Sequence, residues 1–159
     1  MLILVTVMRL TGTPESYWSV GYEAVDAIDI TSSSNILMRG ISLFGSLSGA
    51  DTRNGKIQLK ETASQTIIHS ENFQFTSNGK GDYFDHIFSS PGNGKAGVKY
   101  TVTVEYDDTQ RIYWAEGEAA RTTAACNGKT ANFEFSDSTD DNNSSNATQG
   151  QIPRILNSC

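Results

Sequence analysis

The 159-residue chain has few of the residues that stabilise small secreted proteins or bind metal ions. It contains two cysteines, Cys126 and Cys159, and two histidines. One disulfide that uses the last residue of the chain would be a poor framework for a secreted fold. A zinc site needs three or four Cys, His or carboxylate ligands at suitable spacing, and the sequence does not supply them. We therefore expect no metal and no cofactor.

Positive charge is also scarce. Twelve Lys and Arg are scattered among 18 Asp and Glu, and the net charge is −6. Nucleic-acid binding needs a clustered basic face, and attraction to an anionic membrane needs a basic run. The sequence has neither, so we expect no nucleic acid and no membrane among its partners.

No long apolar run is present. The stretch "MLILVTVMRL" is apolar only from Leu2 to Met8, which is too short to span a bilayer. It has no basic residues before the apolar part and no cleavage site of the A-x-A type after it. Its Ile, Val and Thr content favours a buried strand over a signal peptide. We therefore expect an intracellular, cytoplasmic protein.

The chain lacks helical periodicity and shows alternation of apolar and polar residues instead. In "GVKYTVTVEY", for example, every second residue from Val98 to Tyr106 is Val or Tyr. Asn-Gly is the preferred centre of a type I′ turn, which requires positive φ at both residues. The tripeptide Asn-Gly-Lys, a predicted hairpin turn, occurs at Asn54–Lys56, Asn78–Lys80, Asn93–Lys95 and Asn127–Lys129.

These patterns predict one all-β domain over residues 1–159, with little or no helix. Short strands separated by turn residues are typical of an antiparallel β-sandwich of the jelly-roll kind. The polar stretch "SDSTDDNNSSNATQG" is predicted to be a long exposed loop. About ten strands are expected, at residues 2–8, 23–30, 35–44, 56–61, 65–75, 82–88, 98–106, 110–116, 130–135 and 151–156.

The sequence contains three patterns that could indicate chemistry, and the residues around each of them argue against that interpretation. "GNGKAG", Gly92–Gly97, has the spacing of a dinucleotide fingerprint, but a strand pattern follows it where a helix is required. "NGKT" lacks the leading glycine of a P-loop, because position 123 is Thr123. His86 has Asp82 and Asp85 nearby, but no nucleophile motif such as G-x-S-x-G is present. We expect no catalytic residue.

Three stretches together resemble one family. They are "YWSVGYEAVDAIDI", "NILMRGISLFGS" and "ATQGQIPRIL", and they cover about residues 15–156 in register. The chain resembles the PHR domain, which PAM/Highwire-type neuronal ubiquitin ligases share with some BTB-domain adaptors. It departs from the family pattern after Leu156, where an aromatic residue is usual, and in a shorter "AEGEAARTTAA" region. The residues that carry the structural motif are Asp26, Gly40, Phe44, Gly45, Gly150, Gln151 and Pro153.

The resemblance implies a monomeric, non-catalytic β-sandwich that recognises other proteins. It would belong to a large neuronal RING-type E3 ubiquitin ligase that regulates axon growth and synapse formation. Exposed aromatic and Arg residues are the usual anchors of interfaces. Tyr17, Trp18, Tyr22 and Arg121 are therefore the predicted partner-binding residues. For Trp18, a core position that closes one end of the sandwich is the alternative.

Two other functions remain open from the residues alone. Asn142, Asn143 and Asn146 begin N-glycosylation sequons, which would suit a secreted jelly-roll carbohydrate-binding module. A hydrolase built around His86 is the second alternative, and it requires an open cleft at that ring.

Overall fold

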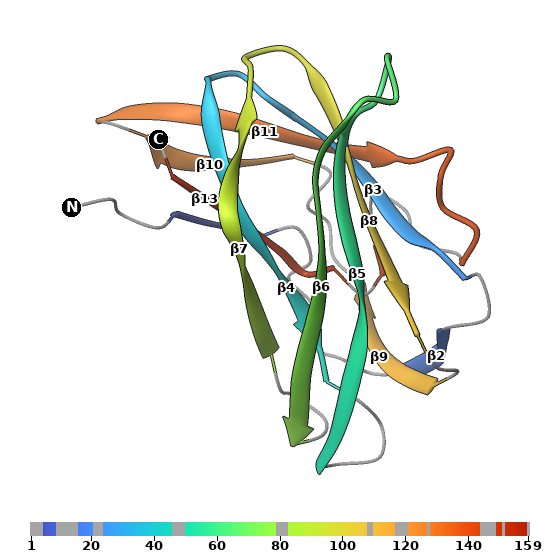
Figure 1. The fold of residues 1–159 in the computed structure, drawn as a ribbon. Coiled ribbons are helices and arrows are strands. Elements are labelled where there is room, and N and C mark those ends of the chain that lie inside the picture. The colour runs from blue at the N-terminus through green and yellow to red at the C-terminus, as the bar shows by residue number, and fades with distance from the viewer. Residues whose placement is uncertain are drawn as a thin grey trace.

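The computed structural model describes residues 5–8, 16–20, 24–45, 50–78, 83–107, 110–116, 121–126, 128–143, 149–150 and 152–158, all of which form strands, turns or connections (Figure 1). The described residues contain no helix, and their strands pair antiparallel, so the predicted fold class is confirmed. The strands are β1 (Val5–Met8), β2 (Ser16–Val20), β3 (Asp26–Ser32), β4 (Ile36–Phe44), β5 (Ala50–Glu61), β6 (Ile67–Asn78), β7 (Tyr83–Gly94), β8 (Lys99–Tyr106), β9 (Gln110–Glu116), β10 (Arg121–Cys126), β11 (Lys129–Asp137), β12 (Gln149–Gly150) and β13 (Arg154–Ser158).

Each of the ten expected strands has a counterpart, but the described residues also form β2, β10 and β12. The expected number of about ten was therefore wrong. β12 is only two residues long, and β10 consists of small and polar residues without apolar alternation. Neither segment carries the pattern from which a strand can be predicted.

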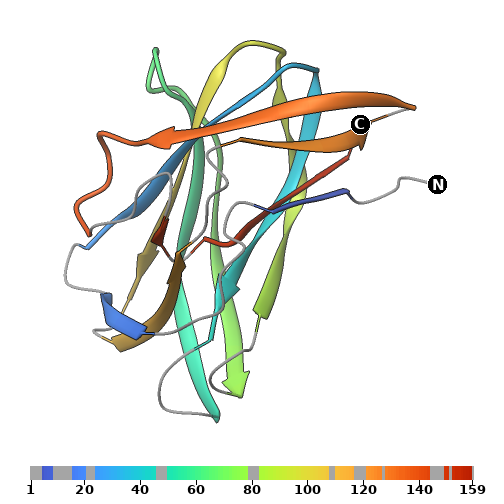
Figure 2. The same cartoon turned by 180° about the vertical axis from the view of Figure 1, so that it is seen from behind.

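The strands form a four-stranded sheet, a six-stranded sheet and a small three-stranded sheet. Their orders are β1-β13-β4-β7, β10-β11-β3-β8-β5-β6 and β12-β9-β2. The first two sheets lie against each other, and the two opposite views show the long strands as two layers (Figures 1 and 2). Strands that are neighbours in sequence often belong to different sheets. Strand pairing within each sheet therefore mostly joins residues that are far apart in the sequence.

The core lies between these two layers. Period-2 alternation places one set of side chains inward from each strand, as expected for a sandwich. Ile28, Ile57 and Val102 come from three neighbouring strands and are at most 1% exposed. Burial of each such side chain stabilises the fold by about 1.5–3 kcal/mol.

Only part of the predicted turn chemistry is found. Gly128, with φ 75°, lies in the tight connection between Cys126 and Lys129, which pair with each other. Asn54 and Gly55 instead lie inside β5, where they pair with β6, so that predicted turn is wrong. Asn93 and Gly94 end β7, and the turn that follows has Gly97 at φ 75°. The remaining predicted turn, at 78–80, continues into residues outside the described part of the chain.

The turn between β5 and β6 carries no glycine. It spans residues 62–66, and Gln65 occupies the left-handed region with φ 59°. Its backbone N–H donates to the Glu61 carbonyl, and Glu61 N–H donates to the Thr66 carbonyl at 3.0 Å. These hydrogen bonds hold a conformation that costs a non-glycine residue about 1–2 kcal/mol.

The polar segment after β11 does not project freely into solvent. Asp141 Oδ1 accepts a hydrogen bond from Ala27 N–H at 2.9 Å, and Asp140 forms an ion pair with Lys60. Residues 138–143 thus lie along β3 and reach β5, and we call them the polar strap. The expectation of an exposed loop was wrong for this part of the segment. Its Asp and Asn side chains satisfy backbone donors of β3, which a purely compositional argument does not register.

Candidate functional site

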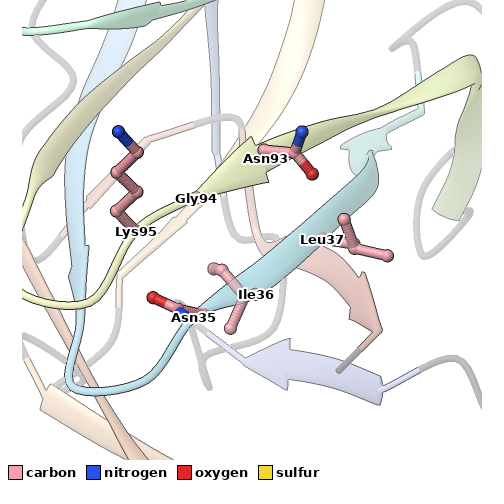
Figure 3. A pocket seen from close by; sticks show the side chains of 6 residues that line it. All are labelled: Asn35, Ile36, Leu37, Asn93, Gly94 and Lys95. Atoms are coloured by element: carbon pink, nitrogen blue, oxygen red, sulfur yellow. The ribbon is translucent and has the colours of Figure 1, made fainter.

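A pocket of about 360 Å³ lies where β4 begins and β7 ends (Figure 3). Backbone pairing brings its two walls together, because Ile36 pairs with Gly94 and Leu37 pairs with Asn93. The pocket combines apolar surface with exposed amide and ammonium groups. It is lined by Asn35, Ile36, Leu37, Asn93, Gly94 and Lys95.

Glycine and hydrogen bonding shape the walls of this pocket. A Cβ at Gly94 would lie 2.9 Å from the Ile36 side chain, so glycine allows the two strands to approach here. Asn35 Oδ1 accepts a hydrogen bond from Ala96 N–H at 2.9 Å, which ties the start of β4 to the turn after β7. Lys95 N–H donates to the Tyr100 hydroxyl at 2.8 Å. The walls are therefore held by strand pairing and by hydrogen bonds from backbone N–H groups to side chains, and the Asn93 and Lys95 side chains are exposed beside them.

The pocket provides binding chemistry. Asn35, Asn93 and Lys95 are exposed at its rim, and Ile36 is buried beneath them. Amide groups donate and accept hydrogen bonds, and the ammonium group attracts a carboxylate. Small apolar patches with a few polar groups around them are typical of sites that fix the orientation of a ligand or a peptide side chain.

The predicted partner-binding residues are placed only in part. Tyr17 and Trp18 lie in β2 and pair with Tyr113 and Ile112 of β9. Arg121 begins β10 and pairs with Glu134. Tyr22 lies outside the described residues. The surface role of these four residues stays a prediction.

The residues of the sequence motif lie in the sheets and their ends. Gly40 is buried in β4, and a Cβ there would lie 2.0 Å from the carbonyl oxygen of His86. Phe44 is fully buried at the end of the same strand, and Gly45 follows it. Pro153 is buried and directly precedes β13, so no ladder hydrogen bond of that strand is lost. Gly150 belongs to β12, and Gln151 lies outside the described residues.

Asp26, the first residue of β3, is fully buried. The Nδ2 group of Asn143 donates to both of its carboxylate oxygens, at 3.2 and 3.4 Å. A glycan attached to this nitrogen would replace those bonds, so the folded chain is a poor acceptor at Asn143. Burial and the Asp26 charge raise the pKa of Tyr106 above its ordinary value, and Arg53 opposes this shift. Asp26, Tyr106 and Arg53 are thus buried polar groups at one end of the core.

His86 does not lie in an open cleft. Its Nε2 atom is 3.0 Å from Glu71 Oε1, and its ring lies within 6.3 Å of the ring centroids of Phe73, Phe84 and Phe88. The His86 side chain is 15% exposed. A general base needs access to its substrate, so the hydrolase alternative loses the cleft it requires.

Of the two acidic residues near His86 in the sequence, the structure describes Asp85, and its side chain is directed away from the His86 ring. Asp85 points to the other face of β7, because successive residues of a strand alternate. Its Oδ1 atom accepts hydrogen bonds from Ser42 Oγ at 2.5 Å and from Arg154 Nη2 at 3.1 Å. Asp82 lies outside the described residues. The carboxylate that contacts His86 is Glu71 of β6, which sequence spacing could not identify.

The described residues contain neither a metal-binding cluster nor a helix that could span a membrane. No group of three or more His, Cys, Asp or Glu side chains among them is arranged to hold a metal ion. No helix in this part of the chain is long and apolar enough to cross a membrane.

Taken together, the two-layered antiparallel fold and a small pocket with a polar rim define a β-sandwich binding domain. The sequence pattern of the PHR domain matches residues 8–158. The chain therefore belongs to the PHR domain family, whose members are non-catalytic protein-interaction domains.

Relatives with the same pattern are longer proteins. BTB/POZ domain-containing protein 6 of Homo sapiens is 29% identical over 132 residues, which are 82% of this chain and 23% of that protein. The protein of the same name from Xenopus laevis is 30% identical over 132 residues, 82% of this chain and 24% of its own length. The chain thus spans about a quarter of the length of these curated relatives.

The sequence analysis did not predict the pocket. Asn93, Gly94 and Lys95 form one of the four Asn-Gly-Lys motifs, which were all interpreted as turns. Asn35 begins one of the three stretches that carry the family resemblance. The signals were present, but only the pairing of β4 with β7 brings the two segments together.

Proposed function

We propose that this chain is the partner-recognition domain of a neuronal RING-type E3 ubiquitin ligase that regulates axon growth and synapse formation. The observation that carries the proposal is the PHR match over residues 8–158. The resemblance of three sequence stretches to the PHR domains of PAM/Highwire-type ligases supports the ligase context. In this role the domain selects a partner and leaves ubiquitin transfer to other parts of the assembly. It acts in the cytoplasm as a monomeric domain.

The pocket between β4 and β7 is the proposed docking point. Its apolar floor suits one apolar side chain of a protein partner, and its rim suits a neighbouring acidic side chain. Lys95 provides the charge complement, and Asn93 provides an amide beside it. Charge complementarity of this kind sets specificity and association rate.

Affinity capture from neuronal lysate tests the proposal. We expect the wild-type chain to enrich a defined set of proteins that includes subunits of a RING-type ubiquitin ligase. A Lys95→Glu variant should reduce capture of its direct partner by about tenfold, because like charges across an interface are strongly unfavourable. Lys56→Glu is the matched control, since Lys56 is also exposed but lies in the middle of β5.

The outcomes separate the two parts of the proposal. A captured set without ubiquitin-ligase subunits would contradict the ligase context. Equal capture by the folded pocket variant and the wild type would show that the pocket is not the docking point. Loss of capture by the Lys56→Glu control would move the interface to the outer face of the six-stranded sheet.

A further inference from the structure

The pocket between β4 and β7 lies where the chain has no negative charge. The chain as a whole contains 18 Asp and Glu and has a net charge of −6. Residues 30–50 and residues 86–104 contain no Asp or Glu, and these two stretches provide both walls of the pocket. Their Lys and Arg residues are Arg39, Lys95 and Lys99. The walls therefore carry positive charge on a molecule that is negative overall.

Two of these cations have no partner within the described part of the chain. Neither the Lys95 ammonium group nor the Arg39 guanidinium group forms an ion pair or a hydrogen bond there. Lys60, in contrast, pairs with Asp140. Lys95 is exposed and Arg39 is half-buried. Both charges can therefore interact with an acidic partner, and such complementarity selects a partner by its charge.

Strand register arranges the two cations on either side of an apolar side chain. Leu37 and Arg39 are the half-buried residues of β4 between buried neighbours, so their side chains are directed outward. Lys95 lies at the level of Asn35, one residue beyond the last pair of β4 with β7. Figure 3 shows Lys95 and Asn35 at one end of the pocket and Leu37 at the other. The order along β4 is therefore cation, apolar side chain, cation.

The spacing of these groups matches an extended segment. Asn35 and Arg39 are four residues apart in a strand, which corresponds to about 13 Å at a rise of about 3.3 Å per residue. Side chains four residues apart in an extended partner have the same separation, whereas on a helix they lie only about 6 Å apart. Every second side chain of an extended segment points to the same side. Two acidic side chains with an apolar one midway between them would therefore meet the three groups together.

The negative charge of the rest of the molecule does not cancel this attraction. Exposed charges separated by more than the Debye length, about 8 Å at physiological ionic strength, are largely screened from each other. An acidic side chain in contact with Lys95 or Arg39 interacts mainly with that cation. The local charge of the pocket walls therefore decides which segments bind.

We propose that the pocket binds an extended acidic segment of a partner protein, in which an apolar side chain stands midway between two acidic side chains four residues apart. The apolar side chain packs against Leu37. One carboxylate pairs with Lys95 and the other with Arg39. The inference rests on the proposed function in taking the pocket as the docking point, and it names the chemistry of the segment that docks.

A labelled peptide of the sequence Gly-Ser-Asp-Ser-Leu-Ser-Asp-Ser-Gly tests the inference with the purified 159-residue chain. We expect fluorescence polarisation to show binding. A version with Asn in place of both Asp residues should bind about tenfold more weakly, because each exposed ion pair contributes about threefold. A version in which the two Asp residues stand next to each other, before Leu, should bind about threefold more weakly, since only one of them reaches a cation.

Double-mutant cycles assign each carboxylate to its cation. Lys95→Gln and Arg39→Gln should each weaken binding of the unmodified probe about threefold. Two further probes carry a single Asn, one in place of the first Asp and one in place of the second. Lys95→Gln should weaken only one of these probes, and Arg39→Gln should weaken only the other, because a cation whose partner is already removed has nothing left to lose.

Lys56→Gln is the matched control for the charge change. Lys56 is exposed in the middle of β5, away from the pocket, so this variant should bind every probe as the wild type does. Urea midpoints of the three variants should equal that of the wild type, since all three side chains are directed outward. Raising the salt concentration from about 0.05 to 0.5 M should weaken the unmodified probe more than the doubly Asn-substituted one.

Several results would overturn the inference. These are no binding of the unmodified probe, equal binding of the doubly Asn-substituted or adjacent-Asp version, or Lys95→Gln and Arg39→Gln affecting both single-Asn probes alike. If Lys95→Glu lowers capture from lysate while the probe does not bind, the pocket stands as the docking point and the acidic segment is wrong. Equal capture by Lys95→Glu and the wild type contradicts the docking point itself, whatever the probe does.

Discussion

Gly40 lies where the backbones of two paired strands come closer than a side chain allows. A Cβ at this position would meet the carbonyl oxygen and carbon of His86 at 2.0 and 3.0 Å. These atoms belong to backbone and cannot rotate away. The pairing of β4 with β7 also shifts register between Met38 and Gly40. A glycine is therefore required at the point where the pairing of β4 with β7 shifts register.

We predict that Gly40→Ala destabilises the chain by about 3 kcal/mol, because even one methyl group forces the two strands apart. Gly97→Ala is the comparison. A Cβ at Gly97 meets nothing within 4 Å, so only its φ of 75° opposes the change. That substitution should cost about 1–2 kcal/mol. Chemical denaturation of both variants gives the two values, and a Gly40→Ala protein as stable as the wild type would contradict the prediction.

At the residue scale the sequence predicts glycine in turns better than glycine in strands. Gly128 lies in a tight turn as its Asn-Gly motif indicates. Gly55 has the same preceding residue and lies in mid-strand. Its Cβ would meet the Glu105 carbonyl oxygen at 2.2 Å and the Phe73 ring at 2.6 Å. The reason for this glycine is a contact with residues far along the chain, which a local motif does not contain.

At the scale of elements, the polar strap lies against the start of β3, and its side chains accept hydrogen bonds from backbone N–H groups there. Asn142 Oδ1 accepts from Val25 N–H at 2.6 Å, and Asp141 Oδ1 accepts from Ala27 N–H. Asp141 also accepts from Asn143 N–H at 3.1 Å, which closes a local turn. The strap therefore supplies acceptors to the start of β3 that a neighbouring strand would otherwise supply.

We predict that Asp141→Ala destabilises the chain by about 1–2 kcal/mol, since it leaves the Ala27 donor without its acceptor. Hydrogen exchange at the Ala27 amide should become faster than in the wild type. Asp107→Ala removes an exposed carboxylate elsewhere and should change neither quantity. Unchanged exchange at Ala27 in the Asp141 variant would show that the strap is not needed at β3.

Elements with strong alternation were predictable. The sequence of β8 alternates apolar and polar residues over its whole length, and the same pattern identified β3 and the second half of β5, residues 56–61. The position of the polar strap was not predicted, because its polar composition indicates a solvent-exposed loop. Its place next to β3 depends on the path of the whole chain, which composition does not contain. The pocket escaped for the same reason, because it needs the pairing of Ile36 with Gly94 across the four-stranded sheet.

At the scale of the whole molecule, the two main sheets meet at the seam between β6 and β7. Glu71 of β6 lies 3.0 Å from His86 Nε2 and accepts from Ser89 N–H of β7, so it joins the sheets. His69 Nε2 contacts the same oxygen at 3.2 Å. Phe75 and Phe84 stack beside them with ring centroids 4.7 Å apart. The seam thus combines aromatic packing with one carboxylate that contacts both edges.

The charge of Glu71 should make the closure of this seam depend on pH. Burial alone would raise the pKa of Glu71, but the surrounding His69, His86 and Ser89 outweigh it and lower the pKa below 4.5. A carboxyl whose pKa is lower in the folded state than in the unfolded state stabilises the fold above the unfolded value. That contribution is lost as the pH falls through the folded value.

We predict that Glu71→Gln lowers the free energy of unfolding by about 1.5–3 kcal/mol at pH 7, the range for hydrogen bonds to a charged group. The difference from the wild type should shrink as the pH falls below 4.5, because the wild-type carboxyl then becomes neutral as well. Urea denaturation of both proteins at pH 7, 5, 4 and 3 measures this. Glu105→Gln, at an exposed position of β8, should track the wild type throughout. A Glu71→Gln deficit that stays constant down to pH 3 would show that the charge of Glu71 does not hold the two sheets together.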